Sequence, residues 1–216
     1  FRIPPPESLG EGAWNRGLEV GRYKAVDDTL AHGVEAYSGM PEVFFTWVRR
    51  TDKRVHFEFL DNSVAQGERP RTVAFGWNGT LNVLDVGRLL DVERYRHVNV
   101  DALSPAALYP DPQALAPSRN TGFLVQCIEQ FATVHFADRE TGRIYLKIER
   151  GVPAFVDGPL LRDALRDSDA RAGIAAIAPA ALEVGFPTPP RPAHLHEITG
   201  FDTARTLGSW GSANRA

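Results

Sequence analysis

The sequence has only one cysteine, Cys127, among its 216 residues. A single thiol excludes an internal disulfide framework and any metal site made of several cysteines. Long apolar runs are also missing, since no stretch approaches the roughly 18 to 20 residues that a membrane helix needs. These absences predict a soluble chain that is compatible with a reducing compartment.

An excess of positive charge is absent as well. The chain has 24 basic and 27 acidic residues, for a formal net charge of −3. Binding to nucleic acid or to an anionic membrane depends on clustered positive charge, so the composition favours neither partner. Arginine outnumbers lysine by 21 to 3. A GC-rich coding sequence accounts for this bias, and recognition of carboxylates or phosphates by guanidinium groups is the alternative.

The two ends of the chain differ from its middle. Three consecutive prolines and no apolar segment occupy the first residues, so we expect no signal peptide there. The side chains that can form a core lie between residues 18 and 184. We therefore predict an extended segment over residues 1–17, a single domain over residues 18–184 and a proline-rich C-terminal arm over residues 185–216.

Strand patterns dominate the first half of the chain. Residues 42–50 are rich in aromatic and β-branched side chains, and residues 54–60 alternate between polar and apolar. Together they predict a hairpin in which the apolar residues of the second strand face the core. A second hairpin is predicted over residues 72–86, because Asn78-Gly79 tolerates the positive φ angles of a type I′ turn.

The second half of the chain adds helices. Residues 104–118 contain four prolines and predict a long loop that crosses the domain. A helix is predicted over residues 120–134, a strand over 143–149 and short helices over 159–184. The apolar stripe of the first helix is formed by Phe123, Leu124, Cys127, Ile128, Phe131 and Ala132. Strands followed by helices predict an α+β fold with a mainly antiparallel sheet, one amphipathic helix packed on it, short helices and an extended C-terminal arm.

Three residues are candidates for catalysis: Cys127, His135 and His97. Cys127 lies on the apolar stripe, so a buried structural thiol is the favoured interpretation. His135 follows it by eight positions, or about 12 Å along a helix, and direct pairing is not expected. A histidine that acts as a general base needs a partner within hydrogen-bond reach, and the sequence does not give that distance.

His194 and His196 form the pattern closest to a metal site. In an extended segment both side chains project to the same side and can reach one metal ion. A third ligand would have to come from elsewhere in the chain, and the His-Glu-x-x-His spacing is absent because Gly200 occupies its last position. Solvated histidines are therefore the favoured interpretation, and we expect no metal and no cofactor.

A basic cluster lies next to aromatic residues near position 50. Bases or phosphates can stack and pair on such a surface, as on the sheet platforms that bind single strands. The aromatic residues can equally form the inward face of the sheet, with the charges gathered at a turn. We favour this second interpretation, and therefore no nucleic-acid partner. The cluster comprises Arg49, Arg50, Lys53 and Arg54, beside Phe44, Phe45, Trp47 and Phe57.

The sequence favours a non-catalytic binding or protein-interaction module over an enzyme. It contains no dinucleotide fingerprint, phosphate loop or nucleophile elbow. We expect a protein partner or an assembly, contacted by the sheet face or by the C-terminal arm, where Phe201 and Trp210 resemble interface anchors. The alternative is a hydrolase or lyase that uses His97 or His135 with a carboxylate at the mouth of the sheet. Whether the chain is an enzyme stays open at this point.

Overall fold

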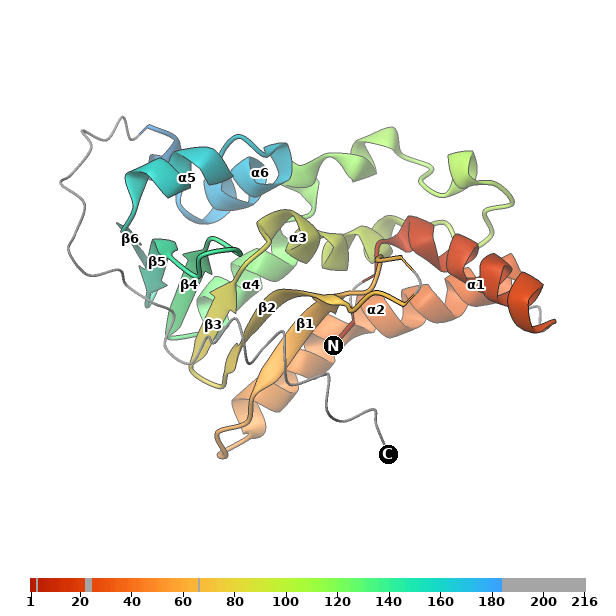
Figure 1. The fold of residues 1–216 in the computed structure, drawn as a ribbon, viewed down its shortest axis with the longest axis horizontal. Helices are drawn as coiled ribbons and strands as arrows, with labels where there is room; N and C mark the ends of the chain where they lie inside the picture. The colour runs from red at the N-terminus through yellow and green to blue at the C-terminus, as the bar shows by residue number, and fades with distance from the viewer. Residues whose placement is uncertain (3, 22–24, 66, 184–216) are drawn as a thin grey trace.

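The computed structural model describes residues 1–2, 4–21, 25–65 and 67–183, which form an α+β fold (Figure 1). Six strands make one sheet in the order in which they occur in the chain. Neighbouring strands run antiparallel, except for the parallel pair β3 and β4. The strands are β1 (Phe57–Asp61), β2 (Arg71–Trp77), β3 (Thr80–Val83), β4 (Thr133–Ala137), β5 (Ile144–Glu149) and β6 (Val152–Phe155). The predicted fold class is confirmed.

The helices lie before, between and after the strands. They are α1 (Pro6–Val20), α2 (Val26–Arg50), α3 (Val86–Arg94), α4 (Gly122–Gln130), α5 (Gly158–Ala164) and α6 (Ser168–Ile177). Short 3-10 turns accompany them at Tyr95–His97, Pro105–Ala107, Pro112–Leu115, Pro117–Arg119 and Pro179–Leu182. Among the helices of the described ranges, none has the length and apolar character needed to cross a membrane.

The parallel pairing of β3 with β4 explains the long middle segment. Two parallel neighbours cannot be joined by a tight turn, because the chain must return to the starting end of the sheet. Residues 84–132 make this return through α3, three proline-rich 3-10 turns and α4. The predicted crossing loop over residues 104–118 is confirmed as part of this connection.

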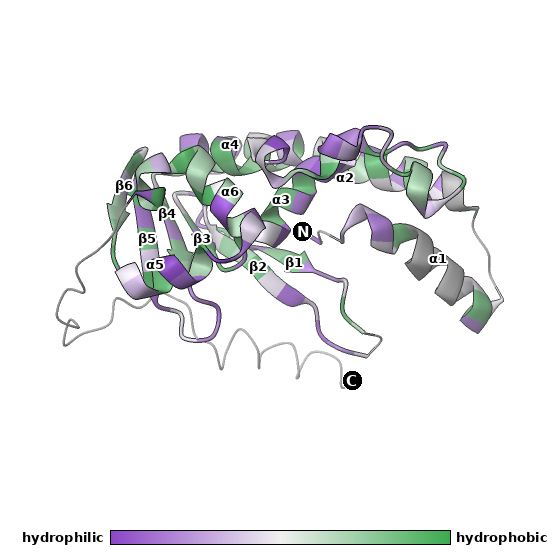
Figure 2. Cartoon of the chain, turned by 90° about the horizontal axis from the view of Figure 1, so that it is seen from above, coloured by the Kyte–Doolittle hydropathy of each residue, from purple (hydrophilic) through white to green (hydrophobic). Residues whose placement is uncertain are grey.

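One face of the sheet carries the main core. Helices α2, α3 and α4 lie along this side, as the view from above shows (Figure 2). Phe44 of α2 is fully buried, and its ring centroid lies 5.0 Å from that of Phe57 and 4.9 Å from that of Phe59, both on β1. Ile174 of α6 and Leu161 of α5 join the same core. More than one helix therefore covers this face.

The strand predicted over residues 42–50 is wrong, because these residues form the last part of α2. Phe44, Phe45 and Val48 are buried, and their spacing of i, i+1 and i+4 places them on one side of a helix. The aromatic and β-branched content of the segment suited a strand, but packing against β1 decides the outcome. The strand predicted over residues 54–60 corresponds to β1, with Phe57 and Phe59 buried as expected.

The hairpin of β2 and β3 is confirmed, but its predicted turn type is wrong. Neither Asn78 nor Gly79 has the positive φ angle that a type I′ turn requires. Asn78 has a different role: its side-chain Nδ2 donates to the carbonyl of Lys53 at 2.6 Å, and its Oδ1 accepts from the amide of Val55 at 3.3 Å. The asparagine thus ties the end of α2 and the start of β1 to the hairpin.

Other boundaries differ from the prediction at both ends. Most of the segment placed at residues 1–17 as extended is helical, because Pro6 suits the first turn of α1, which ends at Gly21 with a left-handed φ of 66°. The helix predicted over residues 120–134 is shorter, since β4 begins at Thr133. The predicted C-terminal arm, residues 185–216, lies outside the described residues. The 3-10 turn Pro179–Leu182 precedes it.

Candidate functional site

The second face of the sheet, turned away from α2, α3 and α4, is called here the pocket face. Residues that pair across neighbouring strands project to the same side of a sheet. One such row is formed by Glu58, Phe75, Asn82, His135 and Lys147, and the next includes Trp77, Thr80, Thr133 and Glu149. The pocket face therefore gathers polar and aromatic side chains from five successive strands, β1 to β5.

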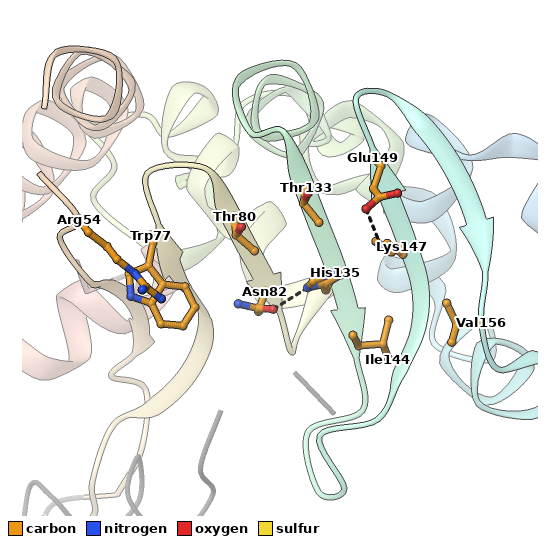
Figure 3. A pocket seen from close by; sticks show the side chains of 10 residues that line it. All are labelled: Arg54, Trp77, Thr80, Asn82, Thr133, His135, Ile144, Lys147, Glu149 and Val156. Carbon is orange, nitrogen blue, oxygen red and sulfur yellow. Dashed lines mark hydrogen bonds and ion pairs between the residues drawn. The ribbon is translucent and has the colours of Figure 1, made fainter. Parts of the chain in front are cut away.

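A pocket of about 550 Å³ lies on this face. Figure 3 shows Trp77 and Arg54 at one side, Asn82 and His135 in the middle, and Lys147 at the other side. A small apolar cluster that includes Phe75, Ala137 and Ile144 supports it. The remaining lining residues are Thr80, Thr133, Ile144, Glu149 and Val156.

His135 is held in one orientation by Asn82, which is fully buried. The side-chain Nδ2 of Asn82 donates to the carbonyl oxygen of Phe75 at 3.4 Å. Its Oδ1 therefore faces Nδ1 of His135, 3.0 Å away, and accepts the proton that Nδ1 carries. This arrangement assigns the tautomer of the ring, and it leaves Nε2 of His135 as a hydrogen-bond acceptor.

The surroundings of His135 favour its neutral form. Burial lowers the pKa of the imidazole, and the nearby ammonium group of Lys147 lowers it further, while Glu149 acts in the opposite direction. Lys147 forms an ion pair with Glu149 at 2.5 Å, and this hydrogen bond lowers the pKa of the Glu149 carboxyl group. At neutral pH the imidazole is therefore uncharged.

Arg54 and Trp77 form the other side of the pocket. The guanidinium carbon of Arg54 lies 5.0 Å from the centroid of the Trp77 ring, a cation–π contact. The imidazole of His56 packs against the same indole at 5.7 Å between centroids. Within the described part of the chain, no carboxylate lies at ion-pair distance from Arg54. Arg54 is thus a positioned cation whose charge is not balanced by a described neighbour.

The pocket brings together only one of the residues singled out from the sequence as candidates for catalysis. His135 lines it, whereas Cys127 lies fully buried in α4, where burial raises the pKa of the thiol well above its usual range. His97 lies in the turn after α3, on the side of Glu93 and outside the pocket. His194, His196, Phe201 and Trp210 lie outside the described residues.

Sequence reasoning did not find Asn82, Trp77 or Lys147 as parts of one site. Side chains alternate between the two faces along each strand, so every second residue lies on the pocket face. This alternation was the signal in the sequence that could have grouped these residues. The basic cluster near residue 50 separates in the structure: Phe44, Phe45 and Phe57 are core residues, and only Arg54 of the cluster's cations lines the pocket. The buried aromatic rings of that cluster offer no stacking surface.

A second cavity, of about 650 Å³, lies among α3, α5 and α6. Its arginines are already paired: Arg88 and Arg94 contact Asp91, and Arg139 contacts Asp85. Over the described ranges, no three histidine, cysteine or carboxylate side chains gather as a metal site would require. The pocket face is therefore the stronger candidate for a functional site.

We predict that Lys147→Gln raises the pKa of His135. The substitution removes a positive charge that disfavours the imidazolium, and it leaves the Glu149 carboxylate, which favours it. NMR titration of the His135 ring protons measures this pKa, with resonances assigned from a His135→Gln variant. Arg150→Gln removes an exposed charge on the next turn and serves as the control. A pKa for His135 that stays the same or falls in Lys147→Gln contradicts this account of its electrostatics.

Chemically, the pocket offers an exposed cation at Arg54 in contact with Trp77, a hydrogen-bond acceptor at Nε2 of His135, and an apolar end at Ile144 and Val156. His135 lies on β4 and Ile144 on β5, whereas Arg54 precedes β1 and Val156 follows β6. Compared with known protein families, with curated proteins and with solved structures, the chain matches none, so its function is argued from this geometry.

Proposed function

We propose that this protein is a binding module without catalysis, and that a protein partner docks on the pocket face. The observation that carries the proposal is Arg54, held against Trp77 beside the pocket with no described carboxylate to balance it. A cation in this position has its hydrogen-bonding edges available to a partner. Arg49 is also exposed and has no described ion pair, but of the two only Arg54 lies against a tryptophan and lines the pocket.

The composition and size of the site support a protein partner. Tryptophan and arginine are the residue types most enriched among those that dominate binding energy at interfaces. The pocket spans β2 to β5, a width of roughly 14 Å from three strand spacings of about 4.8 Å. Such a width accommodates several side chains of an extended segment.

Partner capture by the full-length protein tests this function. The immobilised wild-type protein is compared with an immobilised Arg54→Ala/Trp77→Ala double variant, called here the pocket-face variant. The proteins that each of them captures are quantified by mass spectrometry. We expect the pocket-face variant to lose most of the partner, because truncating an interfacial anchor costs roughly 2 kcal/mol or more of binding free energy. The thermal unfolding midpoint of each variant shows whether it is folded.

Two further variants make the result specific. Val43→Ala/Arg49→Ala changes exposed residues on the outer side of α2 and should leave capture unchanged. Phe201→Ala/Trp210→Ala tests the C-terminal arm as the alternative contact. Loss of the partner in the arm variant alone, or unchanged capture by a folded pocket-face variant, would refute docking on the pocket face.

A second candidate function is general-base catalysis by His135, the hydrolase or lyase alternative. The hydrogen bond from Nδ1 of His135 to Asn82 supports it, because it directs the basic Nε2 away from Asn82. The expected carboxylate partner of the histidine is replaced here by an amide. Turnover on this mechanism must fall as Nε2 becomes protonated, and it must vanish in His135→Gln; turnover that persists in that variant eliminates this candidate.

A further inference from the structure

The pocket has a positive local charge in a protein whose overall charge is negative. Among the residues that line the pocket, Arg54 and Lys147 contribute two cations, Glu149 contributes one anion, and His135 is neutral, which leaves one net positive charge. Glu58, on β1 of the same face, lies outside this lining, with its Oε1 3.8 Å from Nε2 of His56. The whole chain has a formal net charge of −3. Because Lys147 is paired with Glu149, the excess charge resides on Arg54.

The contact with Trp77 prepares Arg54 for one kind of ligand. The guanidinium carbon of Arg54 lies over the Trp77 ring, and a cation–π contact of this kind leaves N–H groups available for hydrogen bonds. Those N–H groups can form two parallel hydrogen bonds with a carboxylate, and the contact with the ring reduces the conformational entropy that the exposed side chain loses when the ligand binds. We propose that the pocket face recognises an acidic segment of a protein partner, whose carboxylate binds Arg54.

This inference rests on the proposed function and specifies the chemistry of the partner. One unbalanced cation matches the single charge of a carboxylate, whereas a nucleic-acid backbone requires several clustered cations. The width of the pocket, roughly 14 Å, accommodates about four residues of an extended chain at 3.3 Å per residue. Ile144 and Val156, at the far side from Arg54, would contact an apolar side chain of the same segment.

NMR titration of the full-length protein with two blocked pentapeptides tests the inference. The probes are Ac-Ala-Glu-Leu-Glu-Ala-NH2 and the same peptide with both glutamates replaced by glutamine. We expect the acidic peptide to shift the indole N–H signal of Trp77 and the ring signals of His135. It should bind about tenfold more tightly than the glutamine peptide, since a hydrogen bond to a charged group is worth roughly 1.5 kcal/mol.

Matched variants assign the difference to one residue. Arg54→Gln should abolish the preference for the acidic peptide, while Arg49→Gln, at an exposed arginine of α2 outside the pocket, should retain it. Inorganic phosphate is titrated separately to distinguish a free anion from a polypeptide carboxylate. If phosphate shifts the NMR signal of Trp77 and the acidic peptide does not, recognition of a polypeptide carboxylate is overturned.

The outcomes separate this inference from the proposed function. Equal binding of both peptides at the pocket face overturns carboxylate recognition and leaves docking on that face intact. Retained preference in Arg54→Gln also overturns it. Failure of the acidic peptide to bind overturns the acidic segment, whereas docking itself is judged by the partner-capture experiment, which does not depend on the charge of the ligand.

Discussion

Phe44→Ala is expected to destabilise the protein by about 3 to 5 kcal/mol, the usual cost of truncating a buried phenylalanine. Phe44 is fully buried, and its ring lies within 5.0 Å of the Phe57 ring and within 6.1 Å of the Phe131 ring, centroid to centroid. The substitution would leave a cavity where α2 packs on β1. Urea unfolding followed by circular dichroism measures the change in the free energy of unfolding.

The neighbouring residue on the same helix provides the control for this prediction. Val43 is 67% exposed, so Val43→Ala should change the free energy of unfolding by no more than about 0.5 kcal/mol. A loss in Phe44→Ala that is as small as the loss in Val43→Ala would show that α2 does not pack on the sheet through this ring.

Gly76→Ala is expected to cost roughly 2 to 3 kcal/mol of stability, in the range of overpacking substitutions. A Cβ atom at Gly76 would lie 2.1 Å from the carbonyl oxygen of Thr80 and 3.1 Å from Cα of Leu81. Because both neighbours are backbone atoms, β2 and β3 must separate to make room. Chemical denaturation measures the loss, and the NMR signals of Trp77 and Thr80 should shift, since both residues line the pocket.

Gly79→Ala is the matched control, three residues away in the same hairpin. A Cβ atom there meets no other atom within 4 Å, and the φ angle of Gly79 lies outside the left-handed region. We expect a change within about 0.5 kcal/mol. If Gly76→Ala lowers the stability no more than Gly79→Ala does, then β2 and β3 do not approach each other as closely at Gly76 as the structure shows.

The sequence predicted elements whose signals are local. The hairpin of β2 and β3 is marked by Asn78-Gly79 between two strand-like runs, and the prolines of residues 104–118 exclude a regular helix or strand. The end of α2 was missed because propensity and packing disagree there: Phe44 and Val48 suit a strand by composition but are buried as parts of a helix. Such a conflict is resolved only by contacts between distant segments.

The candidate site depends on such contacts even more. His135 was identified as a titratable residue, but its hydrogen-bond partner is 53 residues away in the chain. That pairing requires β4 to lie parallel to β3 in one register, since a slip of one residue would turn the side chain of His135 to the other face. Arg54 was placed in a basic cluster, while its contact with Trp77 depends on the pairing of β1 with β2.

The parallel pairing of β3 with β4 has a consequence for how the chain folds. Each row of the pocket contains residues from both sides of the connection over residues 84–132, so the pocket is complete only once that connection has closed. Closing a loop of this length costs conformational entropy, which the contacts between β3 and β4 must offset. A ligand that binds the pocket therefore binds only chains in which both halves have assembled, and above its dissociation constant it stabilises that state by a free energy that rises with the logarithm of its concentration. Ligand binding at the pocket therefore measures the fraction of molecules in which both halves of the sheet are assembled.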